Sequence, residues 1–394
     1  MFLSLKKLSN IDRFINIFYL VLLVVYFFFH AISKTVFFVR SDIFHNIVST
    51  TIRVCIIIIL LIAIYHIATF EFSKRYTIIF LIVFGILFAQ YYISRDGSLL
   101  FFYCFMICAK NYNSTQLMKL LFAMYLFSFS FVLIGGFIGV FPSTSLIRST
   151  GKVRYSLGFW VPNVSSYYLV ILTSLFILIK NVKLGFKHFF VLIIINIVFY
   201  KLTDTKNGLF TSMITITLAI VAKYVSNKLI RKVIVLVSYF SFLFCSIIPF
   251  LLTYWYSKYP EKLANLNYIL SGRLSLQLTA IKKYGVPLFG SLIVHDAQKY
   301  DVIDSSYFSL LLTYGILIFI FMILFFTFET YLSNKTNNIW LSICLLTLAY
   351  YSTFDTPLLS TINNPYSIFI FENILMLYPN AYSRIFGRDV VKVL

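Results

Sequence analysis

Cationic side chains gather in two segments that separate long apolar runs, and they could bind an anion. Guanidinium groups stay charged at every physiological pH and match phosphate or carboxylate oxygens bidentately. A loop longer than about 15 residues usually serves a function. A solvated cationic loop, or for Arg154 a plain loop-to-helix junction, is the structural alternative. The two segments are 142–162, with Arg148, Lys152 and Arg154, and 255–307, with Arg273.

Two proton acceptors occur in the second segment. Asp304 lies near its end, and His295 lies nine residues earlier. A carboxylate or an imidazole can take a proton from a reacting hydroxyl. The alternative for Asp304 is helix capping, in which Ser305 or Ser306 could equally take part. A lone histidine in a loop often has no role beyond solvation.

Two further short turns carry polar pairs. Arg95 precedes Asp96 between two apolar runs, and Asp204 precedes Lys206 in the same way. A cation in such a turn could contact an anionic ligand. A self-paired surface couple, or a helix cap made by Asp204, explains each turn equally well.

Composition excludes most classes of soluble protein. Of 394 residues, 60% are hydrophobic and only 12% are charged, whereas soluble proteins carry about 25% charged residues. The net charge of +20 therefore indicates loop cations that set membrane topology and touch anionic lipid, and no nucleic-acid partner is expected. Nucleotide-binding glycine loops and zinc motifs are absent from the sequence, so we expect no cofactor and no metal.

Apolar runs of the length that spans a bilayer predict an all-α, polytopic membrane bundle in one domain, 1–394. We count about twelve runs, and eleven is the competing number. The fourth, seventh and last runs are short. The runs are 14–32, 52–70, 76–93, 97–109, 117–141, 163–179, 188–202, 209–224, 233–254, 308–328, 339–354 and 366–378.

Charge near the amino terminus predicts the sidedness of the bundle. Lys6, Lys7 and Arg13 favour a cytoplasmic start, and twelve spans then place both termini in the cytoplasm. Segments 142–162 and 255–307 become external loops on this topology. Within the larger loop, which precedes the tenth span, 270–283 predicts an amphipathic helix on the membrane surface.

At these positions the chain resembles the Wzy-type polysaccharide polymerases. The resemblance rests on the many spans, the motif from Arg154 to Asn163, the Ser-Gly-Arg motif ending at Arg273, and the segment from Asp304 through Tyr307 to Gly315. Lys206 stands where the family pattern has arginine. The O-antigen ligases are related in overall plan.

The resemblance implies a metal- and nucleotide-independent glycosyltransferase of the bacterial cytoplasmic membrane. It would polymerise undecaprenyl-pyrophosphate-linked repeat units into O-antigen or capsule on the outer face. Asp304, or alternatively His295, would be the base. The residues implied to contact pyrophosphate or glycan are Arg148, Lys152, Arg154, Arg273, Arg95, Lys206, Asn163 and Tyr307.

Other functions stay open on the sequence. An O-antigen ligase would transfer the glycan to lipid A core, and His295 suits that reaction. A lipid-linked oligosaccharide flippase would show internal repeats and short loops. The implied partners are the bilayer, the lipid-linked glycans, and a flippase and chain-length regulator of the same pathway.

Overall fold

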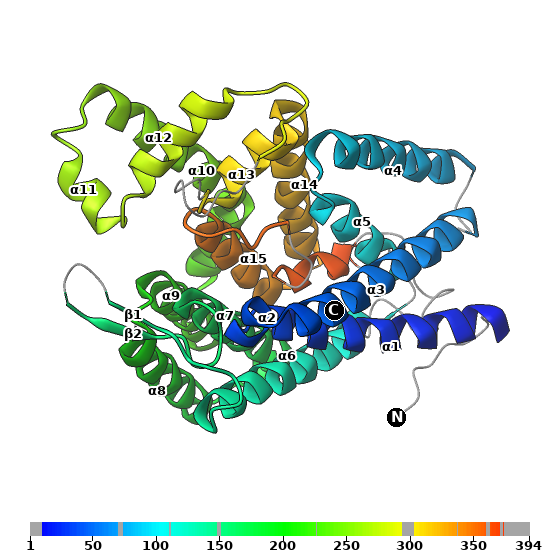
Figure 1. Cartoon of the computed structure of the whole chain (residues 1–394), viewed down its shortest axis with the longest axis horizontal. Helices are drawn as coiled ribbons and strands as arrows, with labels where there is room; N and C mark the ends of the chain where they lie inside the picture. Colours follow the sequence, from blue (N-terminus) through cyan, green and yellow to red (C-terminus); the bar gives the residue numbers. More distant parts are fainter. Residues whose placement is uncertain are drawn as a thin grey trace. The chain divides into compact units, whose positions relative to one another are not determined.

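The computed structural model describes residues 10–69, 74–109, 112–147, 151–225, 227–293, 303–336, 338–359, 363–370 and 373. Within these residues the chain is almost entirely helical, with one short β-hairpin (Figure 1). In this described part of the chain, eight helices are long and apolar enough to cross a membrane, and three shorter apolar helices accompany them. This chain is thus a multi-pass, all-α membrane protein.

The described chain divides into two compact units. The first unit comprises residues 1–69, 104–226 and 368–394, and the second comprises 70–103 and 227–367. Each unit draws on separated stretches of sequence.

The first unit is built around α7. Most of the apolar face of α7 is buried, and it packs against α6, α8 and α9, while α1 packs against α3 and α6. Pro162 begins α7, where its missing N–H is no loss. The helices of this unit are α1 (Asn10–Ser33), α2 (Val36–Arg40), α3 (Asp42–Ala68), α6 (Ser114–Phe137), α7 (Pro162–Lys180), α8 (Phe186–Thr203) and α9 (Lys206–Tyr224).

A β-hairpin occupies the predicted loop 142–162. Strands β1 (Ser145–Ile147) and β2 (Val153–Tyr155) pair antiparallel, with Leu146 opposite Arg154. After β2 the chain turns at Gly158, whose φ of +88° belongs to the left-handed region. A Cβ on Gly158 would lie 2.6 Å from the carbonyl oxygen of Val132 in α6. Only glycine fits this turn, which leads from Arg154 into α7.

The second unit is built around α10. This 31-residue helix packs against α12, α14 and α15. Asparagine side chains cap two of these helices: Asn227 accepts from the N–H of Leu229 in α10, and Asn338 accepts from Leu341 in α15. The elements are α4 (Lys74–Ser94), α10 (Lys228–Lys258), α11 (Ala264–Ile269), α12 (Arg273–Tyr284), α13 (Ser306–Ser309), a π-helical turn (Leu310–Tyr314), α14 (Ile316–Lys335), α15 (Ile339–Ser352) and a 3-10 turn (Pro365–Phe369). Helix α5 (Ser98–Cys108) connects the two units.

The first eleven predicted apolar runs are helical in the structure. Ten of these runs each overlap one helix, whereas the tenth, 308–328, is divided among α13, the π-helical turn and α14. The twelfth run lies largely outside the described residues. The predicted amphipathic helix at 270–283 is α12, which begins at Arg273. The β-hairpin and the short helices α2 and α11 are elements that the sequence analysis did not predict.

Candidate functional site

Arg273 and Asp304 form an ion pair in the second unit. The guanidinium Nε lies 3.4 Å from Oδ2 of Asp304, and their side chains are 16% and 34% exposed. Both side chains are thus partly shielded from solvent and partly exposed. Two predicted site residues, 31 positions apart in the sequence, therefore meet in the structure.

Two neighbouring elements fix the position of Arg273. The side-chain oxygen of Asn267 accepts hydrogen bonds from the N–H groups of Leu274 (3.0 Å) and Ser275 (3.3 Å), so it holds the start of α12. Farther along α12, buried Gln277 accepts a hydrogen bond from Thr253 of α10 at 2.8 Å. Arg273 also donates through Nη1 to the carbonyl of Leu270 (3.2 Å). The guanidinium thus has a fixed direction.

A second carboxylate, Asp355, belongs to the same group of residues. It follows α15, and it accepts hydrogen bonds from the hydroxyl of Tyr351 (3.0 Å) and the N–H of Thr356 (3.0 Å). Its charge interacts with those of Asp304 and Arg273. We call Arg273, Asp304, Tyr351 and Asp355 the carboxylate cluster.

Ser306 joins the two acidic segments of the carboxylate cluster. Its N–H and its hydroxyl both donate to the backbone carbonyl of Asp355 at 2.9 Å, and its hydroxyl accepts from the N–H of Leu358 (3.2 Å). The alternative assignment of Asp304 as a helix cap is not supported. The N-cap of α13 is Ser305, which makes no capping bond, and the Asp304 carboxylate contacts Arg273 instead.

Burial raises the pKa of both acids, Asp304 and Asp355. Desolvation raises the pKa of Asp304, and the Arg273 charge opposes that rise. Desolvation likewise raises the pKa of Asp355 to about 6, although the N–H of Thr356 and the hydroxyl of Tyr351 favour its ionised form. The cluster therefore places two proton acceptors beside one fixed cation, which is an arrangement suited to general-base chemistry near neutral pH.

Arg154 has a structured environment of its own in the first unit. From β2 it donates through Nε to the carbonyl of Thr203 (2.9 Å) and through Nη2 to Oδ1 of Asn163 (2.7 Å). It therefore ties the hairpin to the end of α8 and the start of α7. Asn163, another predicted site residue, serves here as its partner.

The other predicted residues are placed differently. Lys152 lies exposed between β1 and β2, and Lys206 is the exposed first residue of α9. Exposed Arg95 stacks over the ring of Tyr92 at 4.7 Å. Tyr307 is fully buried and donates to the carbonyl of Ala349 (2.9 Å), so its ring cannot pack on a sugar. Arg148 and His295 lie outside the described residues.

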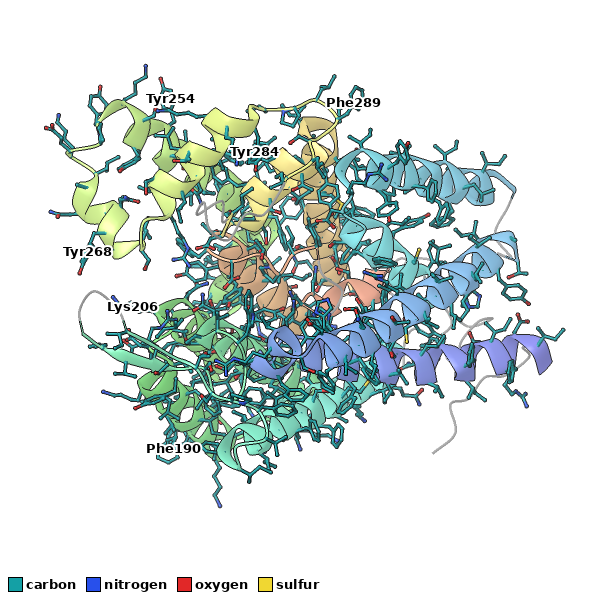
Figure 2. The ribbon with its side chains drawn as sticks, viewed as in Figure 1. Phe190, Lys206, Tyr254, Tyr268, Tyr284 and Phe289 are labelled. Carbon is teal, nitrogen blue, oxygen red and sulfur yellow. The ribbon has the colours of Figure 1, made fainter. Side chains whose placement is uncertain are left out.

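Aromatic and basic side chains alternate around α11 and α12. Lysine ammonium groups lie over tyrosine rings in three pairs: Lys258 with Tyr254 (5.9 Å), Lys262 with Tyr259 (5.3 Å) and Lys283 with Tyr284 (5.1 Å). Figure 2 shows Tyr254 and Tyr284 on this part of the chain together with Tyr268, which is 67% exposed. Such a surface offers ring faces and positive charge side by side.

Sequence reasoning missed Asp355 and Tyr351. A signal for Asp355 was available, because it directly follows the eleventh apolar run, and the predicted topology puts that end on the same side as Asp304. Nothing in the pattern distinguishes Tyr351 from the other 28 tyrosines. No protein-family model, curated protein or solved structure matches this chain.

Proposed function

We propose that this chain is a polysaccharide polymerase that joins undecaprenyl-pyrophosphate-linked oligosaccharides on the outer face of the bacterial cytoplasmic membrane. The observation that carries the proposal is the carboxylate cluster, in which a fixed guanidinium contacts a shielded carboxylate at the end of apolar helices. The proposal also includes twelve spans with both termini in the cytoplasm. The flippase and chain-length regulator remain its expected partners.

The reaction makes two demands that the carboxylate cluster can meet. A sugar hydroxyl of the acceptor attacks the anomeric carbon of the donor, and undecaprenyl pyrophosphate leaves as an anion. The hydroxyl must lose a proton, and Asp304 is the assigned acceptor. The leaving pyrophosphate gains negative charge, and a guanidinium such as Arg273 stabilises that charge without a metal ion.

The Arg273 guanidinium contacts Asp304 before the substrate binds and the leaving pyrophosphate afterwards. In the resting site Arg273 contacts Asp304. When pyrophosphate oxygens take over the guanidinium, Asp304 loses its counter-charge and becomes a stronger base. Arg154, held by Asn163 in the first unit, is a second candidate for phosphate contact.

Loss of the gene tests the reaction. A strain without this chain is expected to make surface glycan of single repeat units and to lose the long-chain ladder on a gel. A normal ladder would contradict the proposal. Long chains that accumulate on the lipid carrier would identify a ligase instead, so this readout also separates the main alternative.

Accessibility of introduced cysteines tests sidedness. In a variant without the native cysteines, Ser275→Cys on α12 is expected to react with a membrane-impermeant maleimide in intact cells. Asn334→Cys, near the end of α14, is expected to react only after the membrane is opened. The reverse pattern would place the carboxylate cluster in the cytoplasm and contradict an outer-face reaction.

A further inference from the structure

A carboxyl group lies buried inside the second unit, far along α14 from the carboxylate cluster. Glu329 is 0% exposed. It lies about 20 Å along the helix axis from Ile316, at a rise of about 1.5 Å per residue. The segment with Asp304 precedes α14, so Glu329 lies toward the opposite end of this helix. The proposed glycan chemistry makes no use of Glu329.

Ser367 is the polar neighbour with which the Glu329 carboxyl interacts among the described residues. The Ser367 hydroxyl faces the carboxyl, yet neither group completes a hydrogen bond of normal geometry. Ser367 is itself only 1% exposed. One turn earlier on α14, Phe326 packs against Phe102 and Phe242, with ring centroids 6.0 Å and 5.0 Å away. An aromatic cluster thus lies one helical turn from the carboxyl on α14, and the Ser367 hydroxyl is its polar neighbour.

Among the described residues, Glu329 has no counter-ion. Helix α14 packs against α10, α15 and the π-helical turn, and neither α15 nor the turn carries a charged residue. The charged residues are Lys335 on α14 itself and Lys228, Arg231, Lys232 and Lys258 toward the ends of α10. The other titratable groups on these elements are Cys245, Cys344, Tyr239, Tyr254, Tyr256, Tyr314, Tyr331, Tyr350 and Tyr351. Helix α5, which contacts α14 through Phe102, adds Tyr103, Cys104 and Cys108, and the 3-10 turn that carries Ser367 adds Tyr366; neither element has a charged residue.

A proton is the cation that needs the fewest oxygen ligands to neutralise the Glu329 carboxylate. An ionised carboxylate buried without a partner is strongly unfavourable, and ionisable groups inside membrane spans commonly mark proton or ion pathways. Hard metal cations such as Ca²⁺ take about six or more oxygen ligands, whereas the carboxyl and Ser367 supply three. A proton needs only the carboxyl, and it creates an O–H donor that the Ser367 oxygen can accept.

We propose that Glu329 and Ser367 form an intramembrane proton-binding site, in which the carboxylic acid of Glu329 donates to the Ser367 hydroxyl. The bound proton joins α14 to the 3-10 turn Pro365–Phe369. Release of the proton removes the donor and leaves a buried negative charge, so the second unit is expected to lose stability in alkaline buffer. This inference does not depend on the glycan reaction.

Dicyclohexylcarbodiimide is a direct probe, because this apolar reagent reacts with protonated carboxyls in apolar surroundings. The acid adds across its N=C=N unit, and rearrangement gives a stable N-acylurea without loss of any group. With the purified full chain in detergent at neutral pH, mass spectrometry of peptides is expected to find the adduct on Glu329. Exposed Glu261 serves as the matched control and should stay unmodified, since the reagent reacts with carboxyls in apolar surroundings and Glu261 faces solvent.

Glu329→Gln keeps the shape and the neutral state of the acid, so it supplies the second measurement. The variant is expected to unfold at the same temperature as the wild type at neutral pH. In alkaline buffer the wild-type midpoint should fall, whereas that of Glu329→Gln should fall less. Glu261→Gln should behave as the wild type at both pH values.

Two outcomes overturn the proposal. The first is the absence of an adduct on Glu329 together with equal alkaline loss of stability in the wild type and Glu329→Gln. The second is protection of Glu329 from the reagent by sodium chloride but not by choline chloride, which would identify a sodium site. Labelling that is unaffected by either salt, with the stability difference described above, supports a proton.

Discussion

Replacing Gly158 with alanine tests how the first unit holds the segment between Arg154 and α7. Gly158 has a φ of +88°, and an added Cβ would lie 2.6 Å from the carbonyl oxygen of Val132 and 3.2 Å from Cα of Gly136. Both neighbours are backbone atoms of α6, so neither can rotate away. The turn must shift as a whole, and Arg154 is attached to it.

The expected cost has two parts. A left-handed conformation costs a residue with a Cβ about 1–2 kcal/mol. Forcing an extra carbon into a packed site costs about 1–3 kcal/mol more. Gly158→Ala should therefore destabilise the chain by about 2–5 kcal/mol, if the two parts add.

Gly151→Ala is the matched control. Gly151 has a similar φ of +77°, but an added Cβ would meet nothing within 4 Å. This variant should lose only the conformational part, about 1–2 kcal/mol. Thermal unfolding of both variants in one detergent measures the difference. Equal unfolding temperatures for the two variants would refute the close contact between Gly158 and α6.

Further predictions concern the acids and the packing of the helices. Arg273→Gln removes the charge that lowers the pKa of Asp304, so the acid limb of the pH–rate profile should move to higher pH; an unmoved limb would contradict the ion pair. Tyr351→Phe removes a hydrogen bond that favours ionised Asp355, so its pKa should rise above about 6. Because that pKa already exceeds the usual 3.8, the protonated form stabilises the fold at low pH, and this contribution is lost as pH rises through the folded value. In Tyr351→Phe this stabilising contribution of protonated Asp355 should be lost at a higher pH than in the wild type. Thermal unfolding across a pH series measures the difference, with Asp355→Asn as the control.

The long helices of this chain could be predicted because a membrane-spanning helix requires a long apolar run. Asn338 before α15 and Pro162 at the start of α7 also mark helix boundaries in the sequence. The hairpin β1–β2 could not be predicted in this way. Its strands have three residues each, with mostly exposed side chains, so no alternation of buried and exposed positions marks them.

The site was predictable in part. Arg273 and Asp304 stood out because charged residues are rare in this chain and both lie in one long loop. Their pairing could not be predicted, since it depends on how Asn267 and Gln277 orient α12. The burial of Tyr307 and the joining of Asp355 to Ser306 arise from packing between α13 and the end of α15, which no local pattern encodes.

The polymer formed by Asp304→Asn tests the central claim most directly. Asparagine keeps the shape of the side chain but cannot accept the proton, so polymer per folded protein should fall by about 10²–10⁴. The measurement uses purified variant with lipid-linked repeat units and is normalised to the amount of folded protein, and Arg273→Lys should lose about 10²–10³ in the same assay. Near-normal polymer from Asp304→Asn would contradict the assignment of Asp304 as the base.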